Sequence, residues 1–171
     1  MRSQEGIILN QIKYVLELIT DTVLGKTKCA LTPLKQNLKL TSAEFDEGVK
    51  KEYVDALLVD KTIFQRLIGR FIYLTHTRPD ITFAVHHLSQ FMQKPKERYM
   101  DAALRIVRCI KKDPGKGLLF KAASNDKIVA YCDADWDACP MSRKFVTEFC
   151  IKIGDSLVSW KSKKQNTEAW P

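Results

Sequence analysis

The chain has 171 residues, enough for one domain or two small ones, and 45% of them are hydrophobic, an ordinary share for a globular protein. Lysine and arginine number 28 against 20 acidic residues, and the net charge of +8 favours a polyanionic partner, nucleic acid before an acidic membrane surface. The N-terminus is too polar for a signal peptide, and no segment approaches the ~18 apolar residues of a membrane span. We therefore expect an intracellular chain, in cytoplasm or nucleus, that is not secreted and has no membrane partner.

The first two thirds of the sequence show the spacing of amphipathic helices. A helix is expected over residues 10–23, and the weakly patterned stretch 26–59 predicts an extended loop with room for a short helix. Three more helices are expected: one over 61–75 with Asp60 as its cap, one starting at Pro79, and one from about 95 to 112. The apolar spacing of the last predicts an inner face made of Tyr99, Ala102, Ala103, Ile106, Val107 and Ile110. The short connections between these three predict a small helical bundle.

After Gly117 the apolar period changes from that of a helix to that of strands. Strands are expected over 118–121, 127–136, 145–153 and 156–161, and the turn residues at 154–155 predict a tight hairpin between the last two. The fold class is therefore α+β, a three-helix bundle followed by an antiparallel β-sheet.

Asp133, Asp135 and Asp137 alternate at the end of one predicted strand, so their side chains would share a face. A cluster of carboxylates favours a divalent cation, and a two-metal phosphodiester site with Mg²⁺ is one interpretation. The other is a strand end with solvated acids. A calcium loop starting at Asp133 fails, because Ala138 stands at its glycine position and Lys144 at its bidentate glutamate position.

Residues 94–121 hold nine basic residues against three acidic ones, a local net charge of +6. The predicted nucleic-acid-binding residues in this stretch are Lys96, Arg98, Arg105, Arg108 and Lys112, of which the last four share one helical face. Such a face would bind phosphates without sequence preference and in a salt-sensitive way. The alternative is the ordinary solvated face of an amphipathic helix.

Several blocks of the sequence resemble the Pol polyprotein of copia-type LTR retrotransposons. The blocks are LIGRFIYLTHTRPDI (67–81), VHHLSQFM (85–92), AALRIVR (102–108), YCDADW (131–136) and VSWKSKKQ (158–165), and residues 6–14 and 32–33 match as well. The resemblance implies that residues 1–60 are the end of the reverse transcriptase palm and its connection. Residues 61–115 would be a thumb-like helical bundle that grips duplex nucleic acid or an RNA–DNA hybrid. Residues 117–171 would be an incomplete RNase H-like antiparallel sheet, with Asp133 as its first metal-binding carboxylate.

The sequence also departs from that family. The Tyr-Val-Asp-Asp motif of the polymerase is absent, Asp137 stands where the family has glycine or alanine, and Phe145 and Glu148 replace a small or polar residue and a glycine. In the family's pattern, the second metal-binding carboxylate of the RNase H domain corresponds to a position after residue 168. We therefore expect a truncated, catalytically inactive Pol fragment, a pseudoenzyme with Asp133 as a vestigial ligand and no cofactor of its own, although the parent family uses Mg²⁺.

Two other interpretations remain open. The chain could be a host-recruited module that binds a protein partner through its exposed sheet, or it could have no selected function. Loss of nucleic-acid binding on substitution of the basic residues would favour the first expectation, and salt-indifferent protein binding would favour the module.

Overall fold

The computed structural model describes residues 2–49, 55–122, 125–135, 141 and 144–168, and within these ranges the side chains of 135, 145 and 166–168 are left out. The predictions that concern Trp136, Asp137 and Ala138 lie outside the described residues. The α-helices of the described ranges are α1 (Ile12–Asp21), α2 (Ala43–Gly48), α3 (Lys61–Leu74), α4 (Thr82–Ser89) and α5 (Glu97–Ile110). A 3-10 turn, η1 (Pro79–Ile81), precedes α4.

These helices confirm the helical predictions to within a few residues at each end. The cap of α3 is the expected one, because the Asp60 side chain accepts the backbone N–H of Thr62 at 2.8 Å. Pro79 stands at the first position of its turn, where the missing N–H leaves no bond unmade. The short helix for which the 26–59 stretch has room is α2.

The described strands are β1 (Arg2–Ser3), β2 (Gly6–Leu9), β3 (Leu118–Lys121), β4 (Ile128–Asp135), β5 (Lys144–Ile153) and β6 (Ser156–Glu168). They form two antiparallel sheets of three strands, in the orders β1-β2-β3 and β4-β5-β6. The α+β class is confirmed, and so is the hairpin between β5 and β6. The sequence did not predict β1 or β2, and β6 runs past its predicted end at residue 161.

The first sheet joins the two ends of the helical part. Gly6 lies opposite Lys121, and Leu9 opposite Leu118, so β3 pairs with the N-terminal strand β2. Gly6 has a φ of +150°, and a Cβ at this position would collide with the carbonyl of Phe120. Glycine is therefore required for the close approach of β2 and β3.

The hydrophobic core lies among the helices. The inner face predicted for α5 is confirmed residue by residue, since its buried side chains are Tyr99, Ala102, Ala103, Ile106, Val107 and Ile110. They pack with Phe64, Ile68, Phe71 and Leu74 of α3, which have no exposed surface. Each such side chain contributes about 1.5–3 kcal/mol when it leaves water, which makes this cluster the main source of stability.

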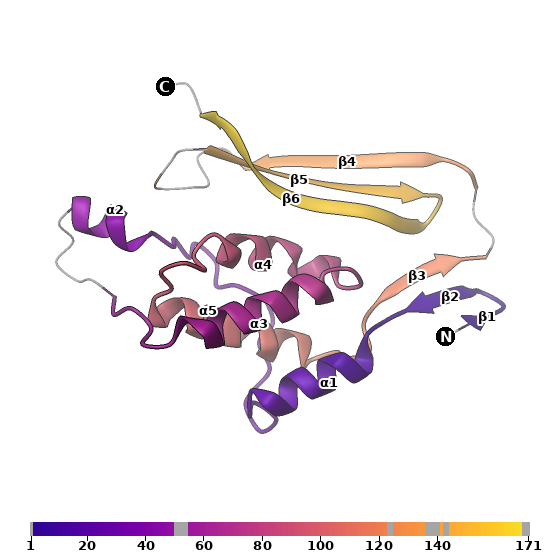
Figure 1. Ribbon diagram of the computed structural model, residues 1–171. Coiled ribbons are helices and arrows are strands. Elements are labelled where there is room, and N and C mark those ends of the chain that lie inside the picture. The colour runs from indigo at the N-terminus through magenta and orange to yellow at the C-terminus, as the bar shows by residue number, and fades with distance from the viewer. Residues whose placement is uncertain (1, 50–54, 123–124, 136–140, 142–143, 169–171) are drawn as a thin grey trace.

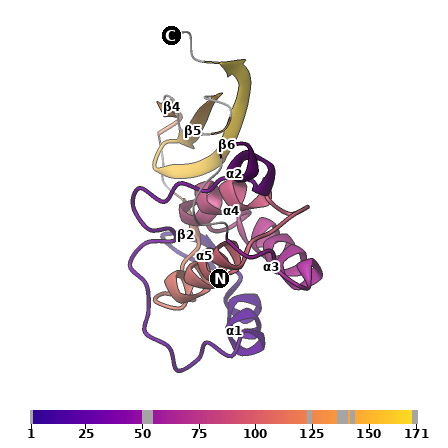
Figure 2. The same ribbon diagram turned by 90° about the vertical axis from the view of Figure 1, so that its left-hand side faces the viewer.

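The sheet β4-β5-β6 forms a layer over α4, with α1 on the far side of the helices (Figure 1). The view turned by 90° shows the same sheet at one end of the helical part (Figure 2). Hydrogen bonds from β6 join these layers: the indole N–H of Trp160 donates to the Thr75 carbonyl at 3.0 Å, the N–H of Lys164 donates to Nε2 of His86 at 3.2 Å, and the Lys164 ammonium donates to Oε1 of Gln90 at 3.4 Å. Of the helices in the described ranges, none has the length and apolar character that a membrane crossing needs.

Candidate nucleic-acid interface and the acidic strand

The basic face of α5 forms one wall of a groove. The opposite wall is the segment after α1, and the groove between them has a volume of about 430 Å³. The charged side chains that line it are Lys35 from that segment and Arg98, Asp101, Arg105 and Arg108 from α5. Four cations and one carboxylate thus share one concave surface, which is a suitable electrostatic surface for phosphate groups.

Hydrogen bonds hold the segment after α1 against α5. The ammonium of Lys111 donates to the carbonyls of Leu24, Gly25 and Thr27 at 3.2, 2.6 and 2.7 Å. Arg105 donates from Nε to the Thr32 carbonyl, and from a terminal nitrogen to its hydroxyl, both at 3.1 Å. These bonds fix the second wall of the groove. The sequence did not predict that Lys111 holds the segment after α1 or that Lys35 lines the groove, because this segment carries no periodic pattern.

The four basic residues of the predicted stripe differ from one another in their contacts. Arg98 forms an ion pair with Asp55 at 3.0 Å, and Arg105 is held by Thr32. Within the described residues no hydrogen bond or ion pair engages the side chain of Arg108, which lines the groove, or that of Lys112, which is exposed just after α5. Arg108 and Lys112 are therefore the cations best placed to meet a phosphate.

Lys96 was predicted to bind nucleic acid, and this prediction is wrong, because the side chain of Lys96 has no exposed surface. Its ammonium donates to Oδ2 of Asp46 at 2.5 Å and to the Thr41 carbonyl at 2.8 Å. The hydroxyl of Tyr99 also donates to the Thr41 carbonyl, and burial, together with the charge of Asp46, raises the pKa of Tyr99 above its usual range. Lys96 anchors the segment before α2 to the start of α5 and is removed from the candidate interface.

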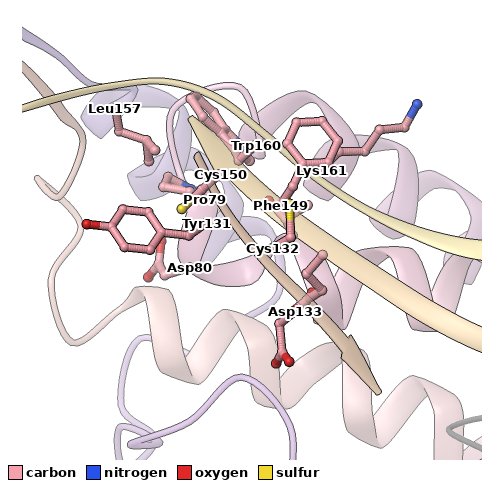
Figure 3. A pocket seen from close by; sticks show the side chains of 12 residues that line it. Pro79, Asp80, Tyr131, Cys132, Asp133, Phe149, Cys150, Leu157, Trp160 and Lys161 are labelled. Carbon is pink, nitrogen blue, oxygen red and sulfur yellow. The ribbon is translucent and has the colours of Figure 1, made fainter. Parts of the chain in front are cut away.

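Asp133, the candidate metal ligand, is an exposed residue of β4. Its Oδ1 accepts the N–H of Ala134 at 2.9 Å, and across the sheet it lies opposite Glu148. Figure 3 shows it at a pocket of about 420 Å³ between the sheet and the start of α4, with Asp80 in the wall. The pocket is lined largely by apolar side chains, among them Tyr131 and Trp160.

The carboxylate of Asp80 is already engaged. Arg78 donates to both of its oxygens, at 2.9 and 3.0 Å, and Lys116 donates at 3.2 Å. Burial draws the pKa of Asp80 upward, but the hydrogen bonds and charges of Arg78 and Lys116 outweigh it and hold the pKa below the usual range.

The described residues do not provide the carboxylate set that Mg²⁺ catalysis needs. No group of three or more histidine, cysteine, aspartate or glutamate residues among them could hold a metal ion. Two-metal sites need several oxygen ligands that converge on ions about 3.5–4 Å apart. Asp133 therefore has Glu148 as its facing carboxylate across the sheet, while the side chain of Asp135 and all of Asp137 lie outside what the structure describes.

Comparison with known proteins shows that the sequence of this chain is similar to retrotransposon sequences. The chain is 33% identical over 164 residues to the retrovirus-related Pol polyprotein from transposon RE1 of Arabidopsis thaliana, a match that covers 96% of this chain and 10% of that protein. Two uncharacterised mitochondrial proteins of the same plant are 31% identical over 164 residues and 43% identical over 82 residues. The match covers 95% of this chain and 63% of the first, and 48% of this chain and 74% of the second.

The chain belongs to the copia-type family of retrovirus-related Pol sequences from transposons. It spans about a tenth of the length of the transposon polyprotein RE1. No family model matches the chain. No solved structure matches it either.

Proposed function

We propose that this chain is a catalytically inactive derivative of a copia-type Pol that binds nucleic acid weakly and without sequence preference. The observation that carries the proposal is the groove beside α5, which is lined by Lys35, Arg98, Arg105 and Arg108, with Asp101 as the one carboxylate among the charged residues that line it. The thumb-like role of the helices and the RNase H-like character of β4-β5-β6 are parts of this proposal.

The expected strength of binding follows from charge. From Arg98 to Lys112 the chain advances by roughly 20 Å at ~1.5 Å per helical residue, a length over which a duplex carries about a dozen phosphates. One face of α5 can reach only a few of them. Neutralisation of three or four phosphates gives a salt slope, log K against log salt, of about −3, and sequence-independent binding has Kd values of order 10⁻⁴–10⁻⁶ M.

The proposed inactivity rests on Asp133. Hydrolysis of an RNA–DNA hybrid requires carboxylates that hold metal ions against the scissile phosphate. The carboxylate of Asp133 is exposed and accepts its neighbour's N–H, and Asp80, in the wall of the same pocket, is occupied by Arg78 and Lys116. Binding without cleavage is the expected behaviour.

The test is a titration of labelled RNA–DNA hybrid with the purified chain in Mg²⁺, at several salt concentrations, on native and denaturing gels. We expect a salt-dependent shift without cleavage. The double variant Arg108→Glu with Lys112→Glu should lose most of the shift and reduce the salt slope by about 2. Lys13→Glu with Lys61→Glu makes the same charge change at exposed positions on α1 and α3 and should keep the shift apart from a small general loss.

Two results would contradict the proposal. If both double variants weaken binding equally, the net charge and not the groove attracts nucleic acid. If Mg²⁺-dependent cleavage appears in the wild-type chain and disappears in Asp133→Asn, the chain has RNase H activity and Asp133 is a working ligand.

A second candidate function is that of a protein-interaction module, and the sheet favours it. Ile128 and Tyr131 of β4 are 70% and 58% exposed, which leaves large apolar side chains on the surface of a strand. Exposed apolar groups of this kind promote association with other proteins. Binding to a protein that is indifferent to salt and is lost in Tyr131→Lys, but unaffected by the Arg108 and Lys112 substitutions, would support this function over the first.

A further inference from the structure

We propose that two copies of this chain associate through the outer edges of β4, in an antiparallel register centred on Ala130. β4 is an edge strand in the order β4-β5-β6, and its pairing with β5 runs without a shift from Ile128 to Asp135. No strand of the described ranges pairs with its other side. The opposite edge strand, β6, lies over the helices, where Trp160 and Lys164 form hydrogen bonds. The proposal does not depend on nucleic-acid binding.

The direction of the backbone groups of β4 can be derived from one hydrogen bond. The N–H of Gly154 donates to the carbonyl of Lys127 at 2.8 Å, so residue 127 directs its backbone groups toward β5. In an antiparallel ladder the groups of successive residues alternate between the two sides. Ile128, Ala130 and Cys132 therefore direct their N–H and C=O outward, while the outward N–H of Ala134 is already bound by the carboxylate of Asp133.

A second copy of β4 fits this edge in a small number of registers. Because outward groups must meet outward groups, a symmetric antiparallel pair has to be centred on a residue of the strand and not between two residues. With the centre at Ala130, this residue faces itself across the two-fold axis. Ile128 then lies opposite Cys132 of the second copy, and Val129 opposite Tyr131.

Charge and the bound N–H of Ala134 together select this register. Lys127 at one end of the edge comes directly opposite Asp133 of the second copy, and the symmetry forms the same pair twice. A pair centred on Tyr131 would also place Lys127 opposite an aspartate, Asp135, but it would need the outward N–H of Ala134, which the Asp133 carboxylate already accepts. Opposite charges at facing positions of a sheet stabilise the pairing, and like charges destabilise it. The pairing also covers Ile128 and Tyr131, which are 70% and 58% exposed in one copy. Residues 128–135 contain neither lysine nor proline, the residues that commonly protect an open edge.

The complementary charges permit a decisive mixing experiment. Sedimentation velocity would be measured over a concentration series with reducing agent present, after nuclease treatment to exclude bridging by nucleic acid. We expect a concentration-dependent dimer of the wild-type chain. Lys127→Asp and Asp133→Lys should each weaken the dimer by about tenfold or more, because each variant alone places like charges opposite each other at both contacts.

An equimolar mixture of these two variants should restore dimers. In the mixed pair every contact again joins a lysine to an aspartate, so the mixture should associate more strongly than either variant alone. The proposal is overturned if the wild-type chain stays monomeric to about 100 µM, a concentration at which an interface of ordinary specific strength would be saturated. A mixture that associates no better than its components overturns it as well.

A proline variant tests the hydrogen bonds of the edge. Ala130→Pro removes the central outward N–H and leaves the bonds to β5 in place, because residue 130 directs its backbone groups away from β5. We expect loss of the dimer with an unchanged circular dichroism spectrum. A dimer that survives this substitution in the folded chain would show that association uses another surface. If the variant does not fold, the mixing experiment decides alone.

Discussion

The ammonium of Lys96 is a buried charge with a buried partner. It has no exposed surface, and the 2.5 Å contact with Asp46 and the bond to the Thr41 carbonyl provide the hydrogen bonds that replace water. Removing two charges from water costs several kcal/mol, so such a pair adds little net stability, but the loss of one partner leaves the other charged and buried. Two residues earlier, Lys94 pairs with Glu44 at the surface, with both side chains more than half exposed.

Replacement of Lys96 should therefore be costly. We expect Lys96→Met to lower the free energy of unfolding by about 3–5 kcal/mol, because the carboxylate of Asp46 stays buried without its ammonium partner. Urea denaturation measures the change. Lys94→Met is the matched control and should leave the urea midpoint almost unchanged, since exposed ion pairs contribute little. Equal effects of the two substitutions would show that Lys96 is solvated in solution.

At the scale of elements, an imidazole on α4 forms a hydrogen bond with β6. Nε2 of His86 accepts the backbone N–H of Lys164, which requires a neutral ring. Burial lowers the pKa of His86, and the charges of Lys161 and Lys164 on β6 lower it further. The neighbouring ring of His87 is stacked on Phe83, and burial, His86 and Lys164 lower its pKa as well.

These shifts predict that mild acid destabilises the chain. The unfolded chain binds protons at the ordinary histidine pKa of about 6.5, whereas the folded chain binds them only at lower pH, so the free energy of unfolding decreases as pH falls below about 6.5. The stability is fully present above this value. Thermal melts between pH 5 and 7.5 measure the effect. This window lies above the range in which Asp80, with its lowered pKa, takes up a proton.

A substitution at the junction separates the two histidines. His86→Gln offers an acceptor oxygen that does not titrate, so the pH dependence of the melting temperature should become shallower, with the contribution of His87 remaining. An unchanged slope in this variant would assign the whole effect to other groups. A melting temperature that rises on acidification of the wild-type chain would contradict the direction of both pKa shifts.

At the scale of the whole molecule, the two layers differ in how they are held. The helices share a core of side chains with almost no exposed surface. Between the sheet β4-β5-β6 and the helices lie two hollows, the pocket of about 420 Å³ at Asp133 and another of about 560 Å³ lined by Ile72, Val85 and Trp160. Side chains that line open hollows lack the dispersion contacts that a filled interface makes, so we expect the sheet to be the less stable layer.

Hydrogen exchange should reveal this difference. We expect the amides of β4, β5 and β6 to show protection at least about tenfold lower than those of α3 and α5, because regions with few buried apolar contacts open independently of the core. Mass spectrometry of peptides after exchange, at a concentration where the chain is monomeric, gives the measurement. Equal protection in both layers would mean that the chain unfolds as one unit.

Much of the fold could be read from local pattern. The buried face of α5, the cap at Asp60, the turn at Pro79 and the β5–β6 hairpin all agree with prediction, because helical period, capping and turn chemistry act over a few residues. The stripe of basic residues on α5 could also be predicted from the sequence, because it depends only on helical spacing. The resemblance to copia-type Pol also came from the sequence alone, and the relatives confirm it.

Only the tertiary structure showed which residues and segments these elements contact. Lys94 and Lys96 look alike in sequence, yet one is exposed and the other buried, because Asp46, fifty residues earlier, lies beside Lys96 alone. The pairing of β2 with β3 and the wall that residues 24–38 add to the α5 groove also join distant segments. Such contacts form only when the helices have packed and brought distant segments of the chain together. Their arrangement depends on the packing of the whole core, so no local pattern in the sequence predicts it.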